Sequence, residues 1–570
     1  MPRTQCRAHA TRRPPHAGHP HTTPSTRAPR SRAAQLGAVE LVPAPLAYST
    51  PIANPFGTGA RRIGPPPSPA GAREERFVSD TTTFVEVDTL AGRVRGLWRG
   101  EPGSAEASAA FLGLPFAEAP VGELRFAAPV PKAPWEGVLD TLEFGASAQR
   151  GDPGVTLIPE PSVPGESTLN VNVFTPSPAA PSEGDGLPVL VWIHGGGFFA
   201  GSPASPWYDG RRFNRDGVVT VTISYRLGFD GFGWIENTPS NRGVRDWMLA
   251  LEWVQQNISR FGGDPARVTI AGQSAGGGAV QTLLGMEAAQ HLFSAVYSIS
   301  GATADVALPR AQQFTRDLAE RLGVAPTREG FASISEERIL EAQKQATAMT
   351  PASFTTVIEE GLALGPVVDG ELIVRRTDES LAAGVGADKP LVIGATDDEF
   401  SMVFADAEKK MRWIPKWVLL RKLGMPKGAM KPYLAANAEV AAKGTARIGG
   451  RFLTDLMFRR ALLRTVAARG AAPTWVYRFS WPSGRFGFAE HCLDVPFFFD
   501  CLDSPVAIEP LAGPNPPQAL ADDVHGGAVS FVTTGEPGWP AYTDATRQTR
   551  VFDTPSRVVT DGYRGVRPLI

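Results

Sequence analysis

The pattern of hydrophobic and polar positions divides the chain near residue 81. Residues 1–80 are rich in Pro, Arg, Ser, Thr and His and show neither helical nor strand periodicity. Such a composition cannot bury enough apolar area to offset the entropy of ordering the backbone. We therefore expect a disordered tail over residues 1–80 and one folded domain over residues 81–570.

Short runs of apolar and β-branched residues begin at Phe84. Residues 84–87 and 92–97 predict an opening antiparallel hairpin, and residues 169–174 alternate as a strand does. Residues 187–193 and 218–223 are almost continuously apolar or β-branched, which is typical of strands buried on both faces of a parallel sheet. The pattern indicates a central sheet with buried inner strands.

A helix and a third buried run follow these strands. The helix is predicted over residues 241–260, because apolar side chains recur there at helical spacing, at Val244, Trp247, Leu251, Val254 and Ile258. Residues 267–273 then form another buried strand. Strand, crossover helix and strand in this order predict an α/β fold with a doubly wound, mostly parallel central sheet and helices on both faces.

The rest of the domain alternates between helical and strand patterns. The sequence predicts helices over residues 310–322 and 335–349, strands over 390–394 and 474–479, and a terminal helix over 518–533. Residues 401–465 have a mostly helical pattern, and their apolar face includes Trp413, Trp417, Leu420 and Leu423. We expect this face to belong to the core rather than to a lid or a membrane contact.

Composition and charge restrict the possible partners. No run of eighteen apolar residues indicates a membrane span. The net charge of -2 hides an asymmetry, because residues 1–73 carry ten Arg and one acid, Glu40, which leaves -11 on the remainder. An acidic domain, with a basic tail that lacks interleaved aromatic residues, predicts no nucleic-acid partner. The oligomeric state stays open.

Cysteine usage and the chain start bear on location. Cys6, Cys492 and Cys501 cannot build a disulfide framework, which favours a reducing, cytoplasmic location. The tail lacks the apolar core of a secretory signal. Its Arg- and Ser-rich, acid-poor start resembles an organelle transit peptide, although a plain disordered tail or a start site assigned too far upstream is the preferred interpretation.

The first chemical motif lies where the third buried strand ends. Gly272, Ser274 and Gly276 fit the pattern G-x-S-x-G, in which a serine on a sharp turn between strand and helix exposes its hydroxyl above the sheet. A turn of small residues that merely links two elements would give the same five letters. The serine therefore needs a base and oxyanion donors from elsewhere in the chain.

A second glycine motif supplies the donors. His194-Gly195-Gly196-Gly197 directly follows the buried strand at 187–193 and matches the loop whose amides form the oxyanion hole in lipases and esterases. Glycine suits this loop because amides can point into the site with no side chain in the way. Ser274 and this loop together predict acyl-transfer chemistry.

The base follows by elimination among eight histidines. Four lie in the tail, His194 belongs to the glycine loop, and His291 and His525 lie in helical contexts. His491 follows the strand at 474–479 through a loop and completes the chain order Ser, acid, His of α/β-hydrolases. The acid is expected just beyond the strand at 390–394, where spacing alone leaves the choice among Asp397, Asp398 and Glu399 open.

Further motifs give the chain a family resemblance from about residue 82 to the end. Residues 111–126, 224–228 and 261–265 resemble signatures of the type B carboxylesterase family, the cholinesterase-like α/β-hydrolases, and its bacterial para-nitrobenzyl-esterase-like members in particular. The resemblance implies that Glu399 is the triad acid and that the amides of Gly196, Gly197 and Ala275 form the oxyanion hole.

The resemblance also implies a structural ion pair. In the family pattern, Arg125 and Glu166 match the two partners. If the pair is buried, removal of either partner leaves a lone buried charge and destabilises the fold strongly.

The chain departs from the family pattern at several points. Gln273 stands before the serine where the family often has Glu, and Thr168 stands where extracellular members have a disulfide cysteine. The loop over residues 151–165 is short and has no Trp, so an aromatic surface for a quaternary ammonium is missing. These departures disfavour choline esters. Asp246-Trp247 also replaces the more usual Asp-Gln.

We therefore expect a serine carboxylesterase that hydrolyses small-molecule esters through an acyl-enzyme, with Ser274, His491 and Glu399 as triad and with no metal or cofactor. An amidase or lipase of the same fold is the nearer alternative, and a non-catalytic cholinesterase-like binding protein is the more distant one. Because His491 must be neutral to act as a base, activity is expected to fall as the pH drops through about 6.5.

Overall fold

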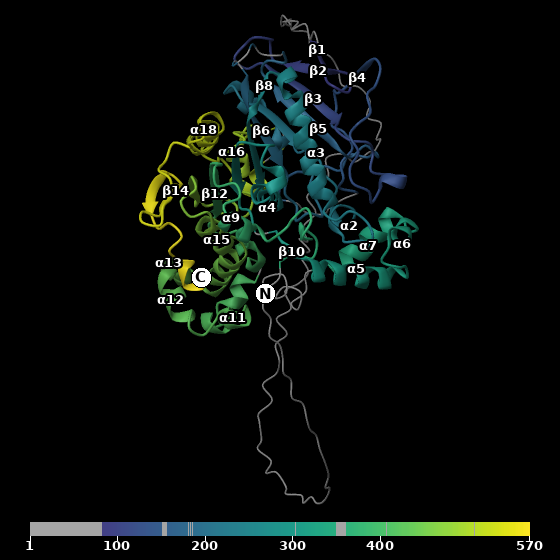
Figure 1. Cartoon of the computed structure of the whole chain (residues 1–570). Helices are drawn as coiled ribbons and strands as arrows, with labels where there is room; N and C mark the ends of the chain where they lie inside the picture. Colours follow the sequence, from purple (N-terminus) through teal and green to yellow (C-terminus); the bar gives the residue numbers. More distant parts are fainter. Residues whose placement is uncertain are drawn as a thin grey trace, which may run out of the picture. The chain divides into compact units, whose positions relative to one another are not determined.

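A thirteen-stranded mixed sheet runs through the part of the chain that the structure describes (Figure 1). The structure is a computed structural model, and it describes residues 83–570 apart from residues 151–156, 180, 181, 183, 185, 303, 349–360, 406, 505 and 507. The tail expected over residues 1–80 lies outside the described residues.

The sheet contains all eight strands that the sequence predicts and five that it does not. The thirteen strands are β1 Phe84–Asp88, β2 Arg93–Arg99, β3 Ser108–Pro115, β4 Val138–Asp140, β5 Asn170–Thr175, β6 Leu187–Ile193, β7 Val219–Ile223, β8 Gly263–Gln273, β9 Ala295–Ile299, β12 Leu391–Thr396, β13 Thr474–Phe479, β14 Gln548–Phe552 and β15 Arg557–Thr560. A separate parallel pair consists of β10 Val306–Ala307 and β11 Val367–Val368.

The strand order confirms the doubly wound sheet. Neighbours follow the order β1-β2-β3-β5-β7-β6-β8-β9-β12-β13-β14-β15, and β4 pairs with β2. The seven strands from β7 to β14 in this order are mutually parallel. Antiparallel pairs close both edges, including the predicted opening hairpin of β1 with β2. The carboxyl ends of β6, β8, β12 and β13 therefore point to the same edge of the sheet.

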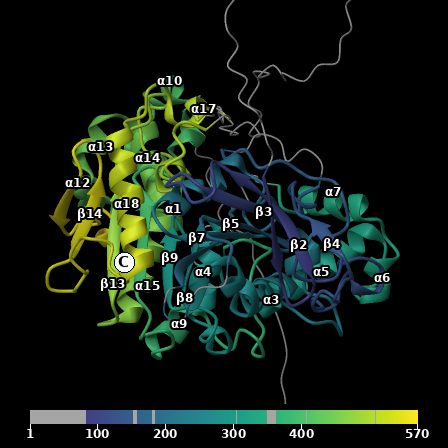
Figure 2. The same ribbon diagram turned by 90° about the horizontal axis from the view of Figure 1, so that it is seen from above.

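Two hydrophobic cores cover the two faces of this sheet. Because side chains alternate along a strand, Val189, Val191 and Ile193 of β6 enter one core, and Leu190 and Trp192 enter the other. The first core is completed by α3 Arg242–Asn257, α4 Ala275–Leu284 and α15 Arg460–Arg469. The second is completed by α1 Arg211–Arg215, α16 Val495–Phe498 and α18 Gln518–Thr534. Figure 2 shows α18 and α4 with the strands between them.

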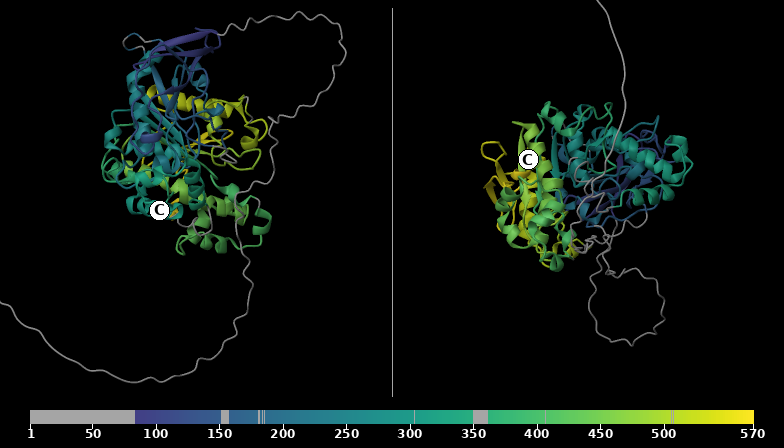
Figure 3. Two further views of the ribbon diagram at one scale, coloured as in Figure 1. Left: turned by 90° about the vertical axis from the view of Figure 1, so that its right-hand side faces the viewer. Right: turned by 90° about the horizontal axis from the view of Figure 1, so that it is seen from below.

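The remaining helices are mostly short. They are α2 Gly228–Phe232, α5 Leu308–Leu322, α6 Arg328–Ala332, α7 Glu336–Ala346, α9 Thr377–Ala382, α10 Glu408–Met411, α11 Lys416–Lys422, α12 Met430–Ala436, α13 Ala438–Ala442, α14 Thr445–Thr454 and α17 Glu509–Ala512. A π-helical turn, Asp455–Arg459, joins α14 to α15. Figure 3 shows the green helices between residues 408 and 454 as a group at one side of the sheet.

The predicted crossover helix is present as α3 and continues as a 3-10 turn, Ile258–Phe261. It ends at Gly262, whose φ of 84° is left-handed. A Cβ at Gly262 would lie 2.1 Å from the carbonyl oxygen of Ser177. Glycine therefore stops the helix and allows the chain to turn directly into β8.

Two expectations for the second half need correction. Trp413 and Trp417 are 78% and 60% exposed, so they do not belong to the core, whereas Leu420 of the same predicted face is fully buried. The helix at residues 518–533 is present as α18, but β14 and β15 follow it. Among the described residues, no helix is both long enough and apolar enough to cross a membrane.

Candidate active site

Ser274 occupies the turn between β8 and α4. Its φ of 57° and ψ of -120° are sparsely populated for a residue with a side chain and cost on the order of 1–3 kcal/mol. Flanking glycines make the turn possible, since a Cβ at Gly276 would lie 2.0 Å from the carbonyl oxygen of Ile193. A Cβ at Gly272 would lie 2.5 Å from the backbone of Gly276. The turn therefore presents the serine at the carboxyl edge of the sheet, as the motif predicts.

His491 brings the serine and an acid into one hydrogen-bonded chain. Its Nε2 lies 2.9 Å from Oγ of Ser274, and its Nδ1 lies 2.5 Å from Oε2 of Glu399. The imidazole is 7% exposed and the carboxylate is fully buried. The structure thus brings together the three residues that the sequence predicts as a triad, and it selects Glu399 among the three neighbouring carboxylates.

The carboxylate of Glu399 is held from its far side. Its Oε1 accepts hydrogen bonds from the Thr396 amide and from Oγ of Ser300, both at 2.7 Å. Its carbonyl oxygen also accepts from the His491 amide at 3.3 Å. Because Oε1 is saturated by donors, Oε2 is left to accept from Nδ1–H of His491. This arrangement fixes the imidazole as the tautomer whose Nε2 can accept a proton from Ser274.

The surroundings of His491 raise the pKa of its imidazole above that of an ordinary histidine. Burial opposes the charged imidazolium and lowers its pKa, but the neighbouring sulfur of Cys492 and the carboxylate of Glu399 stabilise the positive charge. The balance raises the pKa of His491 above its usual value. The neutral imidazole, which alone can act as a base, consequently predominates only at a higher pH than the 6.5 expected from sequence.

The glycine loop adjoins the serine from the end of β6. A Cβ at Gly195 would lie 3.2 Å from Cβ of Ser274, and Gly196 and Gly197 take left-handed φ values of 99° and 64°. The predicted oxyanion hole consists of the backbone N–H groups of Gly196, Gly197 and Ala275. None of the three donates a hydrogen bond to another group in the described part of the chain. These amides are therefore available to an oxyanion.

His194, which opens the loop, has a structural role. Its ring stacks on Tyr225 with centroids 4.5 Å apart, and its Nδ1 lies 2.9 Å from the carbonyl oxygen of Gly195. Burial lowers the pKa of His194 to about 4, so the ring is neutral. Tyr225 also donates to the carbonyl oxygen of His194 at 2.9 Å. The ring shapes the loop and does not compete with His491 as a base.

The other two candidate histidines lie apart from this site. His291 is exposed. His525 is buried in α18, with its Nδ1 2.7 Å from the carbonyl oxygen of Phe498 and its Nε2 3.0 Å from Asp216. Both placements agree with the sequence interpretation of a surface or packed histidine.

Several residues of the site escape sequence reasoning. Phe400 and Phe458 pack on the imidazole of His491, with ring centroids 5.6 and 5.2 Å away. The amide nitrogen of Gln273 lies 3.3 Å from Nε2 of His491 and 3.2 Å from the sulfur of Cys492. Gln273 lies inside the serine motif, so the sequence could have indicated that it belongs to the site. Phe400 and Phe458 lie in segments that no motif marks.

Arginines hold the turn that carries the acid. Asp397 pairs with Nε of Arg478 at 2.8 Å, and Asp398 pairs with Arg447 and Arg451, both at 3.2 Å. The two aspartates therefore face cations on β13 and α14 and not His491. This explains in physical terms why only Glu399, of the three carboxylates, is free to contact the imidazole.

The structure does not bring Arg125 and Glu166 together. Arg125 pairs with Asp230 of α2, with Nε and Oδ2 2.8 Å apart, while Glu166 is exposed. A buried pair lies nearby instead, because the guanidinium of Arg226 binds Asp246 at 2.7 Å and both side chains are at most 4% exposed. Asp246, which the sequence left uninterpreted, thus anchors α3 to the segment after β7.

Comparison with known proteins decides the family. A model described as the carboxylesterase family matches residues 82–565. The chain belongs to the carboxylesterase family. This carboxylesterase is 32% identical to the para-nitrobenzyl esterase of Bacillus subtilis (strain 168) over 79% of its own length and 92% of the relative. It is 29% identical to the fumonisin B1 esterase of Sphingopyxis macrogoltabida over 80% of its length and 85% of the relative.

Solved structures agree with this assignment. The carboxylesterase EST55 of Geobacillus stearothermophilus superposes with a TM-score of 0.71 at 32% identity, covering 85% of this chain and 99% of that chain. A structure titled PNB esterase gives a TM-score of 0.68 at 31% identity with the same coverage. The carboxylesterase therefore has the α/β-hydrolase fold and is a carboxylic ester hydrolase.

Proposed function

We propose that the carboxylesterase works through an acyl-enzyme on Ser274. Its hydroxyl attacks the ester carbonyl while Nε2 of His491 takes the proton, and the same nitrogen then protonates the departing alcohol. Water, activated by His491 in turn, attacks the acyl-serine and releases the acid. The observation that carries this proposal is the continuous chain from Oγ through the imidazole to the buried carboxylate, at 2.9 and 2.5 Å.

Glu399 and the glycine loop complete the proposed mechanism. Glu399 holds the imidazole in the required tautomer and stabilises its charged form during the reaction. The amides of Gly196, Gly197 and Ala275 bind the oxyanion, and each such donor contributes on the order of a hundredfold to the rate. These amides support the proposal because they have no acceptor within the described protein.

The substrates that we propose are small carboxylic esters. Relatives named para-nitrobenzyl esterase cover nearly the whole length of this chain's domain, so para-nitrobenzyl esters are natural test compounds beside short p-nitrophenyl esters. The absence of Trp over residues 151–165 argues against choline esters. A cytoplasmic location remains a prediction from the sequence.

The decisive experiment is the burst and steady-state release of p-nitrophenol from a short-chain p-nitrophenyl ester. Wild type and Ser274→Ala are compared, with thermal melting of both as a control for folding. We expect a burst close to one equivalent per active enzyme and steady turnover from wild type, and neither from the variant. A folded Ser274→Ala variant that retained the burst would reject Ser274 as the nucleophile.

A further inference from the structure

A basic surface of this carboxylesterase extends from α10 to α12. Residues 409–431 contain eight Lys or Arg and no Asp or Glu, although the chain after residue 73 has a net charge of -11. We call these residues the basic tryptophan surface. Its cations are Lys409, Lys410, Arg412, Lys416, Arg421, Lys422, Lys427 and Lys431.

These cations form no ion pair within the part of the chain that the structure describes. All of them are exposed except Lys416, which is half-buried. Arg421 donates to the carbonyl oxygen of Met425 at 2.8 Å, and Arg412 lies over the ring of Trp413 at 4.8 Å. Neither contact removes the positive charge. The surface therefore presents a local excess of positive charge on an acidic domain.

Two large aromatic side chains stand among the cations. Trp413 and Trp417 are 78% and 60% exposed, and they are the most exposed tryptophans in the described chain. The helix α11 begins only at Lys416, so Trp413 lies outside it and does not share its buried face. Trp417 lies about 110° around α11 from the midpoint of the buried Leu419 and Leu420.

The surface is anchored from behind by apolar side chains. Leu419 and Met411 pack with Ala446 of α14 in one small core, and Leu420 and Met425 pack with Tyr433 in another. The exposed rings therefore stand on a fixed support. Figure 1 shows α11, α12 and α13 together at the end of the molecule away from β1 and β2.

We propose that the basic tryptophan surface docks the carboxylesterase on an anionic phospholipid bilayer. Lys and Arg near an anionic leaflet attract its phosphates, and Trp prefers the headgroup level, where its ring is partly apolar and its N–H stays hydrated. An interfacial surface of this kind needs no spanning helix. Each basic residue close to the leaflet contributes about fivefold to the binding constant.

The surroundings of the tryptophans favour a bilayer over a nucleic acid. Ile414 and Val418 are half-buried beside the rings, so the patch presents aliphatic as well as aromatic area. Aliphatic area gains free energy at a lipid interface but offers nothing to a stacked base. A single-stranded nucleic acid is therefore a competing outcome of the test and not the proposed partner.

The test is co-sedimentation of the full chain with vesicles of phosphatidylcholine, with and without phosphatidylglycerol. One variant replaces four exposed cations of the surface, Lys409, Lys410, Lys422 and Lys427, by Gln. A matched variant replaces four exposed cations elsewhere, Arg316, Arg338, Lys344 and Arg564, by Gln, so the two proteins have equal net charge and the same tail. A third variant carries Trp413→Ser and Trp417→Ser.

We expect wild type to bind only the anionic vesicles, and less so as salt is added. The surface variant should lose about a hundredfold or more in binding, and the matched variant should stay within about fivefold of wild type. The tryptophan variant should bind several-fold more weakly and lose the blue shift of fluorescence that wild type shows on vesicles. Turnover of a water-soluble ester, equal in all four proteins, controls for folding.

Three results would overturn the proposal. Equal vesicle binding by the surface and matched variants would assign the binding to the tail or to overall charge. Binding to single-stranded DNA but not to vesicles would replace the lipid by a nucleic acid. A dimer by light scattering, abolished by Trp413→Ser and Trp417→Ser, would assign the surface to a second copy of the chain.

Discussion

Two buried histidines, His491 and His525, show how hydrogen-bond partners decide what an imidazole can do. Each has an acidic partner, Glu399 or Asp216. The other nitrogen of His491 meets the hydroxyl of Ser274, which can donate. The other nitrogen of His525 meets the carbonyl oxygen of Phe498, which can only accept.

The difference decides which ring can take a proton from a neighbouring group. His525 lies between two acceptors, the carbonyl oxygen of Phe498 and the carboxylate of Asp216, so neither neighbour offers it a proton to take. His491 meets an acceptor at Nδ1 and a donor at Nε2, so its neutral form with the proton on Nδ1 can take the proton of Ser274 at Nε2. His525 therefore has a structural role, and His491 can act as a base.

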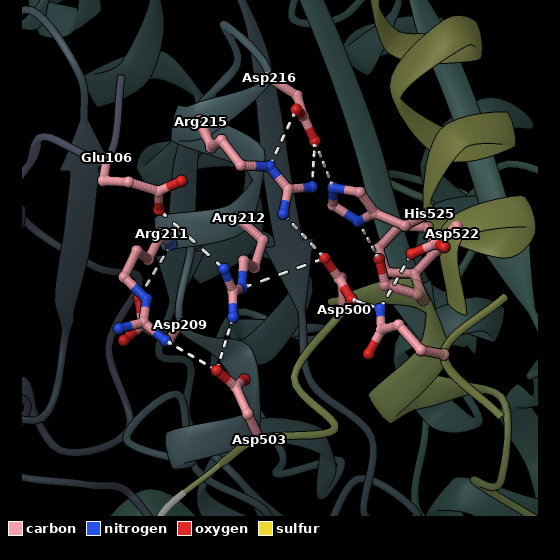
Figure 4. A network of polar contacts seen from close by, with 12 residues as sticks. Glu106, Asp209, Arg211, Arg212, Arg215, Asp216, Asp500, Asp503, Asp522 and His525 are labelled. Carbon is pink, nitrogen blue, oxygen red and sulfur yellow. Dashed lines mark hydrogen bonds and ion pairs between the residues drawn. The ribbon is translucent and has the colours of Figure 1, made fainter. Parts of the chain in front are cut away.

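The surroundings of His525 agree with a structural role. Figure 4 shows Asp216 between His525 and Arg215, and Arg212 and Arg215 reaching Asp500. This network joins α1, the segment after α16 and the helix α18. It contains no hydroxyl or thiol beside the imidazole that could serve as a nucleophile.

The largest expected difference comes from removing each imidazole in turn. The variant His491→Gln should lose at least four orders of magnitude in kcat/KM on a p-nitrophenyl ester, because no other group can take the serine proton. The variant His525→Gln should stay within about threefold at a temperature where it is folded. A folded His525→Gln variant with a comparable loss would contradict the comparison.

Glu399→Gln should lower the activity nearly as much, because it changes the tautomer of His491. The donors from Thr396 and Ser300 would hold the amide oxygen of the new side chain, which turns its NH2 group toward Nδ1 of His491. Nδ1 must then accept, so the proton moves to Nε2 and the base is lost. We expect kcat to fall by about 10⁴, as for the comparable acid-to-amide change in other serine hydrolases.

Asp216→Asn is the matched change for the second histidine. It should leave kcat within about threefold, since it alters only the surroundings of His525. Steady-state kinetics of both amide variants, with melting as the folding control, distinguish the two sites. A loss of kcat in Asp216→Asn as large as that in Glu399→Gln would show that the network of Figure 4 acts on the triad.

The elements that carry both histidines were predictable to different degrees. The strands β6, β7 and β8 are buried on both faces, so their apolar runs predict them directly. The triad residues follow strands whose carboxyl ends share an edge, so chain order predicts their meeting. The choice of Glu399 over its neighbours depends on Arg447 and Arg451, which lie about fifty residues away and which no local pattern assigns.

Two predictions from the sequence that were wrong have local causes. The prediction that Trp413 and Trp417 lie on one buried face required one continuous helix. Pro415 instead separates Trp413 from α11, which spans seven residues. The pair of Arg125 with Glu166 rested on family resemblance, and here Asp230 of α2 occupies the position beside Arg125. Sequence patterns fix which faces are apolar over long elements, and they determine little where helices are short or partners are exposed.

A smaller effect on activity is expected from the arginine-held turn. Asp398→Asn weakens the hold of Arg447 and Arg451 on the segment that carries Glu399, and a displacement of the acid by a fraction of an ångström slows the reaction. We expect kcat to fall about tenfold to a hundredfold with little change in KM. Asp503→Asn, an exposed ion-pair partner in the network of Figure 4, is the matched control and should leave kcat unchanged.

Asp216, the acidic partner of His525, should also contribute to the stability of the fold. Burial raises the pKa of Asp216, but hydrogen bonds from His525 and Arg215 outweigh it and depress this pKa well below its usual value. A depressed pKa contributes stability above the unfolded value of about 3.9, and that contribution is lost as the pH falls further. Asp216→Asn should therefore cost about 1.5–3 kcal/mol near neutral pH and progressively less in acid. A melting difference that did not shrink in acid would contradict this assignment.

The smallest expected effect concerns the sulfur beside the catalytic base. Cys492 stabilises the imidazolium of His491 and thereby raises its pKa, so Cys492→Ala should lower that pKa and move the acid limb of kcat/KM to lower pH. The plateau at high pH should stay within about twofold of wild type, because no bond that the reaction makes or breaks involves the sulfur. Cys501→Ala is the matched control, since Cys501 is also a buried free thiol but does not neighbour the imidazole. Two results would contradict this role of the sulfur: an acid limb that moves to higher pH in Cys492→Ala, or one that moves equally in Cys501→Ala. Either result would show that Glu399 alone opposes the effect of burial on the pKa of His491.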